Sequence, residues 1–246
     1  MRAIETLHLT KRFKSKTAVE DLNLSIGEGE LFSLLGQNGA GKTTTIRMLC
    51  GLLPPSGGDA LLLGESVVKK PQLVKRWINI SPQETAVARN LSVRENLEMI
   101  AGIYGHGPAA ARSRAGEMLS AFGLTERAED KARILSGGMQ RRLSIAMALI
   151  SGPRILFLDE PTLGLDVVAR RELWAHIERL KGRVTIILTT HYLEEAEALS
   201  DRIGVMAEGG LRASGTAAEL VKLMGTKNFE DAFVALATGK EAAKCG

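Results

Sequence analysis

The sequence is poor in cysteine and in aromatic side chains. Only Cys50 and Cys245 occur among its 246 residues, and they form no CxxC pair. This argues against a disulfide framework and a cysteine-ligated zinc site, and it suits a reducing cytosol. Cys50 stands among apolar residues and is expected in the core. Aromatic residues make up 4% of the chain and hydrophobic residues 45%, so the core must be mostly aliphatic.

Long apolar runs are also lacking. A transmembrane helix needs about 18 or more consecutive apolar residues, and the nearest candidate, LSIAMALISGPRILFL, is interrupted by Pro153 and Arg154. The N-terminal stretch MRAIETLHLTKRFKSK lacks the apolar segment of a signal peptide. We therefore expect that the chain does not itself cross a membrane and that any membrane role comes through a partner.

Runs of one charge sign are absent as well. The formal net charge is +4, and the lysine and arginine residues are scattered along the chain. A small positive excess favours an anionic partner, but scattered charges argue against a dedicated nucleic-acid tail. We expect a solvated surface of mixed charge and no nucleic-acid partner.

Short apolar runs separated by turn signals occur in the first part of the chain and again after about residue 150. The runs LFSLLG (31–36) and ILFLDE (155–160) are unbroken, as in parallel strands covered on both faces. The first part of the chain, up to about residue 82, reads as β-rich. The length suffices for one large α/β domain.

A helical stretch interrupts this alternation. Residues 85–135 follow helical periodicity, and Ser92 and Glu95 stand in capping-box spacing. We expect a helical subdomain at about 85–150 inserted in the domain.

The C-terminal part returns to strands and ends in a helix. RIGVMAEGGLRASG reads as a hairpin, and Thr216 and Glu219 cap a last helix that ends at Gly225. The predicted domain therefore spans residues 1–225, followed by a short tail at 226–246.

The stretch GQNGAGKTT matches the phosphate-binding pattern G-x-x-x-x-G-K-[ST], with an apolar strand before it and a helix after it. Its glycines let backbone N–H groups surround a phosphate, and the helix start adds a favourable dipole. A glycine-rich turn with an exposed lysine is the competing interpretation, but the strand–loop–helix context favours a nucleotide site. The predicted nucleotide-binding residues are Gly36, Gln37, Asn38, Gly39, Ala40, Gly41, Lys42, Thr43 and Thr44.

Polar side chains at the ends of other predicted strands complete a catalytic site. Lys42 can reach the β- and γ-phosphates, and the Thr43 hydroxyl can bind Mg²⁺. Asp159 can complete the metal site, because ligands of open α/β sheets bind at the carboxyl ends of the strands, where the phosphate loop also lies. Glu160 can orient or deprotonate the attacking water. His191, which follows IILTT, can contact the γ-phosphate.

Spacing alone does not decide the role of Gln83. Its amide can touch the metal or the water, but a surface glutamine is the simpler interpretation. The predicted catalytic residues are thus Glu160, His191 and Gln83, and the predicted metal ligands are Thr43, Gln83 and Asp159.

A second glycine turn, LSGGMQ, opens another predicted helix. Together with GQNGAGKTT, Gln83, ILFLDEPT, the GLD of residues 164–166 and His191, it resembles the nucleotide-binding subunit of ATP-binding cassette (ABC) transporters. The resemblance covers the chain up to about residue 225. It implies the α/β fold of P-loop NTPases, with a mainly parallel central sheet, an N-terminal antiparallel β region and an inserted helical subdomain.

The resemblance also explains why one chain carries two phosphate-binding turns. In this family, two subunits pair head to tail, and each ATP lies between one subunit's phosphate loop and the other's LSGG turn. It implies that Phe13 stacks on adenine and that Glu160 is the catalytic carboxylate. The residues expected to face the partner are Ser136, Gly137, Gly138, Gln140 and Asp166. We expect the helix to begin at Met139 with free N–H groups.

By this resemblance the chain is the ATP-hydrolysing subunit of a membrane transporter, most similar to bacterial drug-resistance-type exporter ATPases. The implied ligands are ATP and Mg²⁺. The implied partners are a second nucleotide-binding subunit, with a homodimer expected, and a separate transmembrane permease. The chain would be peripheral, on the cytoplasmic side of the membrane. The alternative is a soluble single-cassette ABC ATPase without transport, such as the iron–sulfur assembly type.

Overall fold

The computed structural model describes residues 1–239. Residues 240–246, which include Cys245 and the end of the expected tail, lie outside the described part. The chain forms two compact units: one comprises Met1–Arg76 and the chain from Lys181 onward, and the other comprises Trp77–Leu180. Within residues 1–239, no helix has both the length and the apolar character that a membrane span requires.

The first unit contains an antiparallel sheet in the strand order β2-β1-β4-β5. The long hairpin of β1 and β2 pairs from Arg2 opposite Gly27 to Phe13 opposite Lys16. Its burial alternates along much of each strand, because one face packs on the core and the other meets solvent. The strands are β1 (Arg2–Phe13), β2 (Lys16–Gly27), β4 (Gly57–Leu62) and β5 (Glu65–Ser66).

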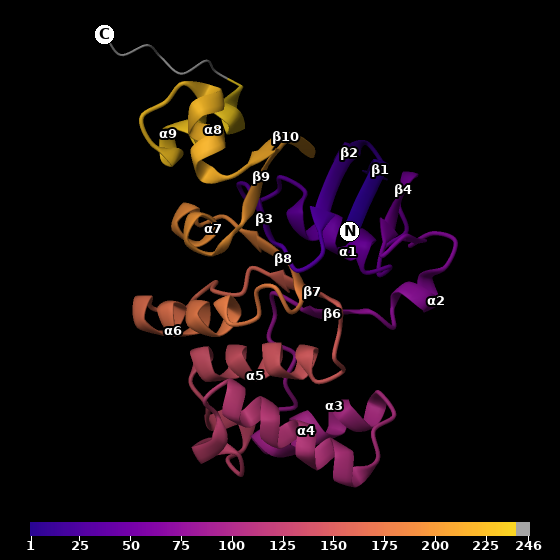
Figure 1. Ribbon diagram of the computed structural model, residues 1–246, viewed down its shortest axis with the longest axis vertical. Helices are drawn as coiled ribbons and strands as arrows, with labels where there is room; N and C mark the ends of the chain where they lie inside the picture. Colours follow the sequence, from indigo (N-terminus) through magenta and orange to yellow (C-terminus); the bar gives the residue numbers. More distant parts are fainter. Residues whose placement is uncertain (240–246) are drawn as a thin grey trace. The chain divides into compact units, whose positions relative to one another are not determined.

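The first unit also contains parallel strands in the order β9-β3-β8, with β10 antiparallel to β9 (Figure 1). β3 and β8 are buried at every residue, as the unbroken apolar run of β3 predicts for that strand. Cys50 is buried as well. The strands are β3 (Leu31–Leu35), β8 (Thr185–Thr190), β9 (Arg202–Ala207) and β10 (Gly210–Gly215). Helices α1 (Lys42–Leu49) and α2 (Pro71–Val74) follow β3 in the chain, and α7 (Leu193–Leu199) lies between β8 and β9.

The segment predicted as a tail contains a helix. After α8 (Ala217–Met224), which has the predicted capping box and ends at Gly225, the chain forms α9 (Phe229–Thr238). The Asn228 side chain caps α9 by accepting the N–H of Asp231 at 2.8 Å.

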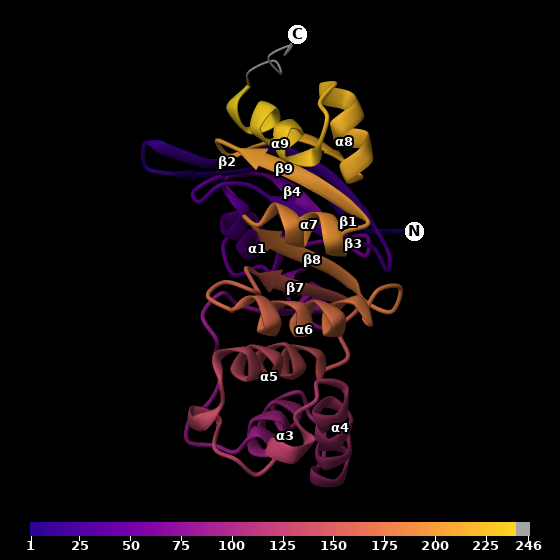
Figure 2. The same cartoon turned by 90° about the vertical axis from the view of Figure 1, so that its left-hand side faces the viewer.

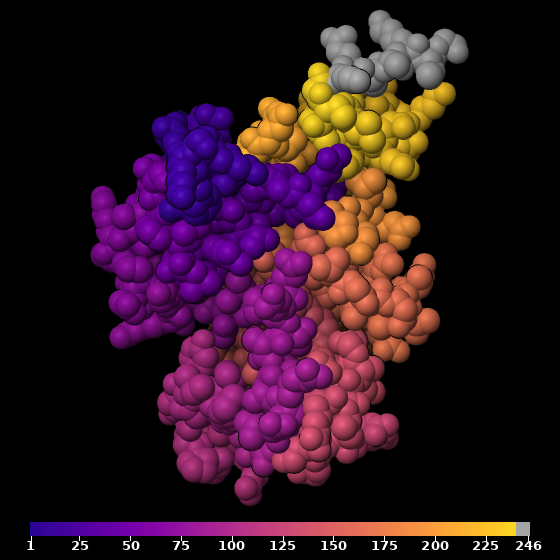
Figure 3. All heavy atoms as spheres, turned by 180° about the vertical axis from the view of Figure 1, so that it is seen from behind, coloured from indigo at the N-terminus to yellow at the C-terminus, as the bar shows by residue number. Residues whose placement is uncertain are grey.

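The prediction that the last helix ends at Gly225 is wrong, because a further group of apolar residues follows at helical spacing. These residues pack in a core cluster with Ile203 and Val205 of β9, and they are Phe229, Phe233 and Leu236. Figure 2 shows α9 beside β9 with α8 next to α9, and Figure 3 shows their yellow atoms next to orange atoms of the preceding part of the chain.

The second unit pairs two parallel strands with a group of helices. β6 and β7 run in register from Ile78 opposite Ile155 to Ser81 opposite Leu158. In Figure 1, α3 and α4 lie side by side next to α5. The elements are β6 (Ile78–Ser81), α3 (Val93–Ile103), α4 (Pro108–Ala121), η1 (Thr125–Arg127), η2 (Ala132–Ile134), α5 (Gly137–Leu149), β7 (Ile155–Asp159) and α6 (Val167–Glu178).

Local side-chain contacts hold these helices in place. The predicted capping box of Ser92 and Glu95 opens α3. The buried Asn96 donates to the carbonyl oxygen of Ser92 at 2.8 Å and accepts the N–H of Ala88 at 2.8 Å, so it ties down the segment before α3. On α6, the ring of His176 donates to the carbonyl of Ala121 at 2.9 Å, and burial lowers the pKa of His176.

Candidate functional site

The phosphate loop, residues 36–41, joins the end of β3 to the start of α1. Gly41 has φ of 105°, and a Cβ at this position would lie 2.5 Å from the carbonyl oxygen of Ala18. A Cβ at Gly36 would overlap the carbonyl oxygen of Met206. Both positions therefore require glycine for the loop to pass so close to neighbouring backbone.

The start of α1 has the chemistry of an anion site. Gly41 is the N-cap and has no side chain to accept the first N–H groups of the helix. These N–H groups and the helix dipole favour an anion at the loop. Residues 37–39 are exposed, and Thr43 and Thr44 are partly exposed on the first turn of the helix.

Lys42 lies across this loop. Its side chain is only 4% exposed, and Nζ donates to the carbonyl oxygens of Gly36 at 2.7 Å and of Gln37 at 3.2 Å. These contacts hold the ammonium group directly over the loop. A small rotation of a flexible side chain is therefore enough to bring it to a bound phosphate.

His191 lies at the same edge of the sheet as the phosphate loop. Leu35 and Thr190 are opposite one another in the parallel pair of β3 and β8, and the N–H of Gly36 donates to the carbonyl of Thr190 at 3.3 Å. His191 follows directly, with its ring centroid 4.1 Å from that of Tyr192. The strand order thus places the histidine beside the loop, as the sequence pattern predicts.

Phe13 ends β1 in the same unit. Its side chain is 46% exposed, and the Lys11 ammonium lies 5.2 Å from the ring centroid. An exposed aromatic face of this kind is what stacking on a purine base requires.

In the second unit, the carboxyl ends of β6 and β7 bring together the other predicted catalytic residues. Asp159 ends β7 and is 4% exposed, and Glu160 follows it at 8% exposed. Because Ser81 is opposite Leu158, the exposed Gln83 follows β6 at this same edge. Glu160 has φ of 45°, in the left-handed region that residues other than glycine rarely adopt.

The sequence patterns missed Arg141, whose buried side chain reaches this edge from α5. Nε donates to the carbonyl of Pro161 at 2.8 Å, and Nη2 donates to that of Asp159 at 2.8 Å. Nη1 donates to the carbonyls of Pro82 and, at 3.4 Å, of Gln83. One signal was available: Arg141 shares the helix face of the buried residues three and four positions later, so its charge needed acceptors in the interior.

The serine–glycine turn opens α5, as predicted, but the helix begins at Gly137 rather than at Met139. Ser136 is the N-cap, and its hydroxyl accepts the N–H of Met139 at 3.2 Å. The expectation that this N–H is free is therefore wrong, because the serine satisfies it locally. Gln140 donates back to the carbonyl of Leu135 at 3.0 Å.

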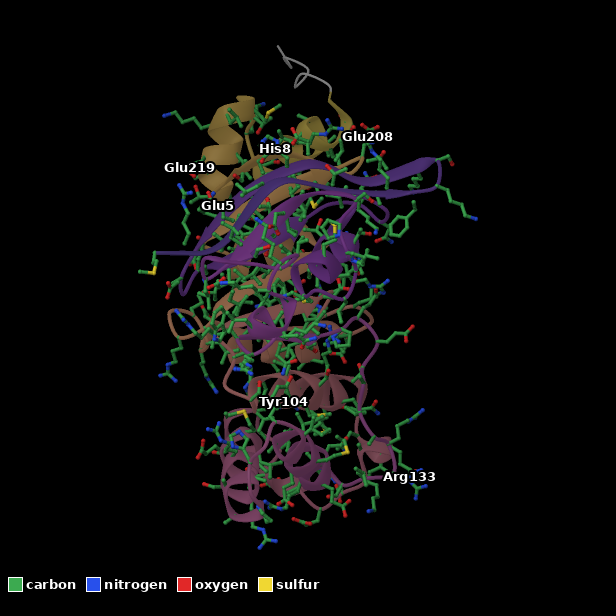
Figure 4. The ribbon with its side chains drawn as sticks, turned by 90° about the vertical axis from the view of Figure 1, so that its right-hand side faces the viewer. Glu5, His8, Tyr104, Arg133, Glu208 and Glu219 are labelled. Carbon is green, nitrogen blue, oxygen red and sulfur yellow. The ribbon has the colours of Figure 1, made fainter. Side chains whose placement is uncertain are left out.

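This turn is at the surface. Ser136 and Gly137 are exposed, and Figure 4 shows the labelled Arg133, three residues earlier, pointing away from the helices of its unit.

The turn lies against the start of α6. A Cβ at Gly138 would be 3.0 Å from the Cβ of Ala169, so a larger residue there would push the two helix starts apart. Asp166 is the exposed N-cap of α6, and it accepts the N–H of Ala169 at 2.9 Å. The structure thus brings the residues predicted to face a partner subunit onto one surface of the second unit.

Comparison with known proteins shows where this combination of features occurs. Residues 19–163 match the protein family described as ABC transporter. The chain is 43% identical over 226 residues to the daunorubicin/doxorubicin resistance ATP-binding protein DrrA of Streptomyces peucetius, which covers 92% of this chain and 68% of that protein. It is 42% identical over 217 residues to the phospholipid-transporting ATPase ABCA3 of Homo sapiens, covering 87% of this chain but 13% of that protein.

Among solved structures, the chain resembles an ATP-binding cassette in a dimeric post-hydrolysis state bound to ADP and Pi. The TM-score is 0.78 at 26% identity, and the match covers 87% of this chain and 98% of that one. The fold class predicted from the sequence and the resemblance to drug-resistance-type ATPases are both confirmed. The chain belongs to the ABC transporter family, as an ATP-binding cassette that hydrolyses ATP.

Proposed function

We propose that the chain powers a membrane exporter by closing, with ATP, onto a second copy of itself. The observation that carries this proposal is the exposed serine–glycine turn beside Asp166. It is a pre-shaped helix start on the surface of the second unit, in a chain whose first unit already has a phosphate loop. A second phosphate-binding turn has a use if it addresses the nucleotide of another subunit.

The first unit would hold the nucleotide. The phosphate loop and Lys42 bind the phosphates, Phe13 stacks on the base, and His191 contacts the γ-phosphate from the neighbouring strand end. Support for these assignments comes from the loop geometry at Gly41 and from the register that sets Thr190 beside Leu35.

Mg²⁺ fits the donor set as well. The Thr43 hydroxyl, the Asp159 carboxylate and the Gln83 amide are the oxygen donors that this ion prefers. Thr43 is partly exposed on the first turn of α1, and Asp159 ends a buried strand. When bound, the ion would neutralise part of the phosphate charge.

Hydrolysis would depend on Glu160. Its carboxylate accepts a proton from the attacking water, or orients that water, and Gln83 follows the adjacent strand end. Loss of the γ-phosphate removes the group that the partner's serine–glycine turn addresses. The two copies then separate.

Transport would follow from coupling this closure to a separate permease. The similarity to a drug-resistance ATP-binding protein and to a phospholipid-transporting ATPase supports an exporter of an amphipathic or lipid-like compound. The chain would then work at the cytoplasmic face of the membrane.

A Glu160→Gln variant tests the closure. ATP binding should persist, whereas turnover should fall by about 10²- to 10⁴-fold, because a general base is lost. Analytical ultracentrifugation should then show a dimer with ATP and a monomer without it. Glu117→Gln, at an exposed position on α4, is the matched control and should behave as the wild type.

An E160Q chain that stays monomeric at saturating ATP would contradict the head-to-tail pair. The transport role has its own test, which is isolation of the tagged wild-type chain from detergent-solubilised native membranes. A co-purifying protein with membrane-spanning helices is expected. Recovery only with soluble partners would favour the iron–sulfur assembly type instead.

A further inference from the structure

The bonds of Arg141 bracket Glu160. The carbonyls of its two chain neighbours, Asp159 and Pro161, both accept from the same guanidinium group. Because that group is planar, it fixes the relative position of the two oxygens. Glu160, between them, has φ of 45°, a conformation that it would readily leave without such restraint. The arginine thus acts on the backbone that aims the Glu160 side chain.

The same guanidinium also holds the residues that follow β6. Nη1 donates to the carbonyls of Pro82 and Gln83. One side chain therefore spans the carboxyl ends of both β6 and β7. A shift of the Gln83 segment relative to Glu160 would break one set of these bonds.

The helix that carries Arg141 is seated on the same strand end by a second contact. The buried Ser144 lies three residues further along α5, and its hydroxyl is 3.0 Å from that of the buried Ser81. α5 begins at the serine–glycine turn with Ser136 as its cap. A rigid helix thus connects that turn to the Glu160 backbone through a side chain on its second turn.

We propose that Arg141 is a positioning residue for hydrolysis, which holds Glu160 and the Gln83 segment in catalytic register and ties both to the serine–glycine turn. The inference rests on the proposed role of Glu160. A contact made by the partner's nucleotide at this turn would be transmitted along α5 to the carboxylate of the chain's own site. Arg141 itself need not touch ATP.

Three variants separate this role from a general effect on folding. Arg141→Met keeps the length of the side chain but removes every donor. Arg141→Lys keeps the charge, but a single ammonium cannot reproduce the planar fork that serves both Asp159 and Pro161. Arg142→Met is the matched control: Arg142 is the next residue on α5, and it contacts the Phe122 carbonyl at 3.3 Å and Glu172 at 3.7 Å, away from these strand ends.

The ATPase kinetics of the full chain give the main readout. For R141M, kcat should fall by about 10- to 100-fold, as when a group that orients a catalytic residue is lost, while KM and the stoichiometry of ATP binding change little. The kcat of R141K should fall in the same way. R142M should retain kcat within about twofold, whatever its melting temperature, because the contacts of Arg142 with Phe122 and Glu172 do not involve the strand ends that carry Glu160 and Gln83.

A double-mutant cycle with E160Q makes the test specific. If Arg141 acts through Glu160, R141M should lower the residual rate of E160Q far less than it lowers the wild-type rate. A purely structural defect would lower both rates by the same factor.

The outcomes are distinguishable. The inference would be overturned if R141M and R141K kept the wild-type kcat, or if R141M lowered the rates of the wild type and of E160Q by the same factor. The proposed function would remain intact in both cases. If E160Q instead hydrolyses ATP as fast as the wild type, the proposed function is overturned. If R141M does not fold, R141K alone decides by the same two readouts.

Discussion

At the scale of single residues, one substitution can separate the capping role of Asp166 from its proposed role at the dimer interface. Its carboxylate caps α6 by accepting the N–H of Ala169 at 2.9 Å, and it is exposed beside the serine–glycine turn. Asparagine caps helices about as well as aspartate. Asp166→Asn should therefore leave the melting temperature and ATP affinity unchanged but slow turnover, because only the charge proposed to act at the dimer interface is lost.

The comparison variant is Asp166→Ala, which removes the cap as well and should cost about 1 kcal/mol of stability. Thermal unfolding, nucleotide titration and steady-state ATPase assays on both variants give the three quantities. A wild-type turnover rate in D166N would assign the residue to capping alone.

At the scale of elements, α9 shows how much an undetected helix contributes to the core. Phe233 is 9% exposed within the cluster that also contains Ile203 and Val205, whereas the next residue, Val234, is 51% exposed. Phe233→Ala should lower the free energy of unfolding by about 3 to 5 kcal/mol, because it leaves a cavity in this cluster.

Equilibrium urea denaturation measures this effect, and Val234→Ala on the same helix is the control. Its effect should stay within about 0.5 kcal/mol, as for most surface substitutions. Equal midpoints for the two variants would mean that α9 does not contribute to the core of its unit.

Elements with strong local signals were predictable, and those defined by distant contacts were not. The capping boxes of α3 and α8 and the unbroken runs of β3 and β7 follow from residues within a few positions of each other. α9 begins with a readable cap at Asn228, but its apolar face has meaning only against β9, which is distant in sequence. The sequence alone therefore predicts a tail at this position.

The same distinction separates the site residues. The phosphate loop is a contiguous pattern, so its residues could be named in advance. Arg141 could not, because its acceptors come from two other segments, at residues 82–83 and 159–161. Periodicity gives no information on the φ of Glu160 either.

At the scale of the whole molecule, the proposed pairing predicts a rate that depends on concentration. Each chain would contribute half of each of two nucleotide sites, so only the dimer turns over efficiently. Well below the dissociation constant of the dimer, doubling the chain concentration should raise the rate per chain about twofold, by mass action.

Specific ATPase activity measured over a dilution series, with an inert carrier protein to prevent adsorption, provides the data. Sedimentation at the same concentrations reports the oligomeric state. Constant specific activity from a species that sediments as a monomer would be inconsistent with shared sites.

The position of Lys42 has a consequence for how strongly the cassette can hold a nucleotide. Because its ammonium is already bonded to the carbonyls of Gly36 and Gln37 and the residue is only 4% exposed, the lysine must exchange existing bonds for any contact that it makes with a phosphate. On the proposed role, nucleotide arrival is thus an exchange of partners, and the net affinity is the small difference between them. When the phosphate departs, the loop carbonyls are at hand to take the ammonium back, so the empty state that starts the next turnover restores itself.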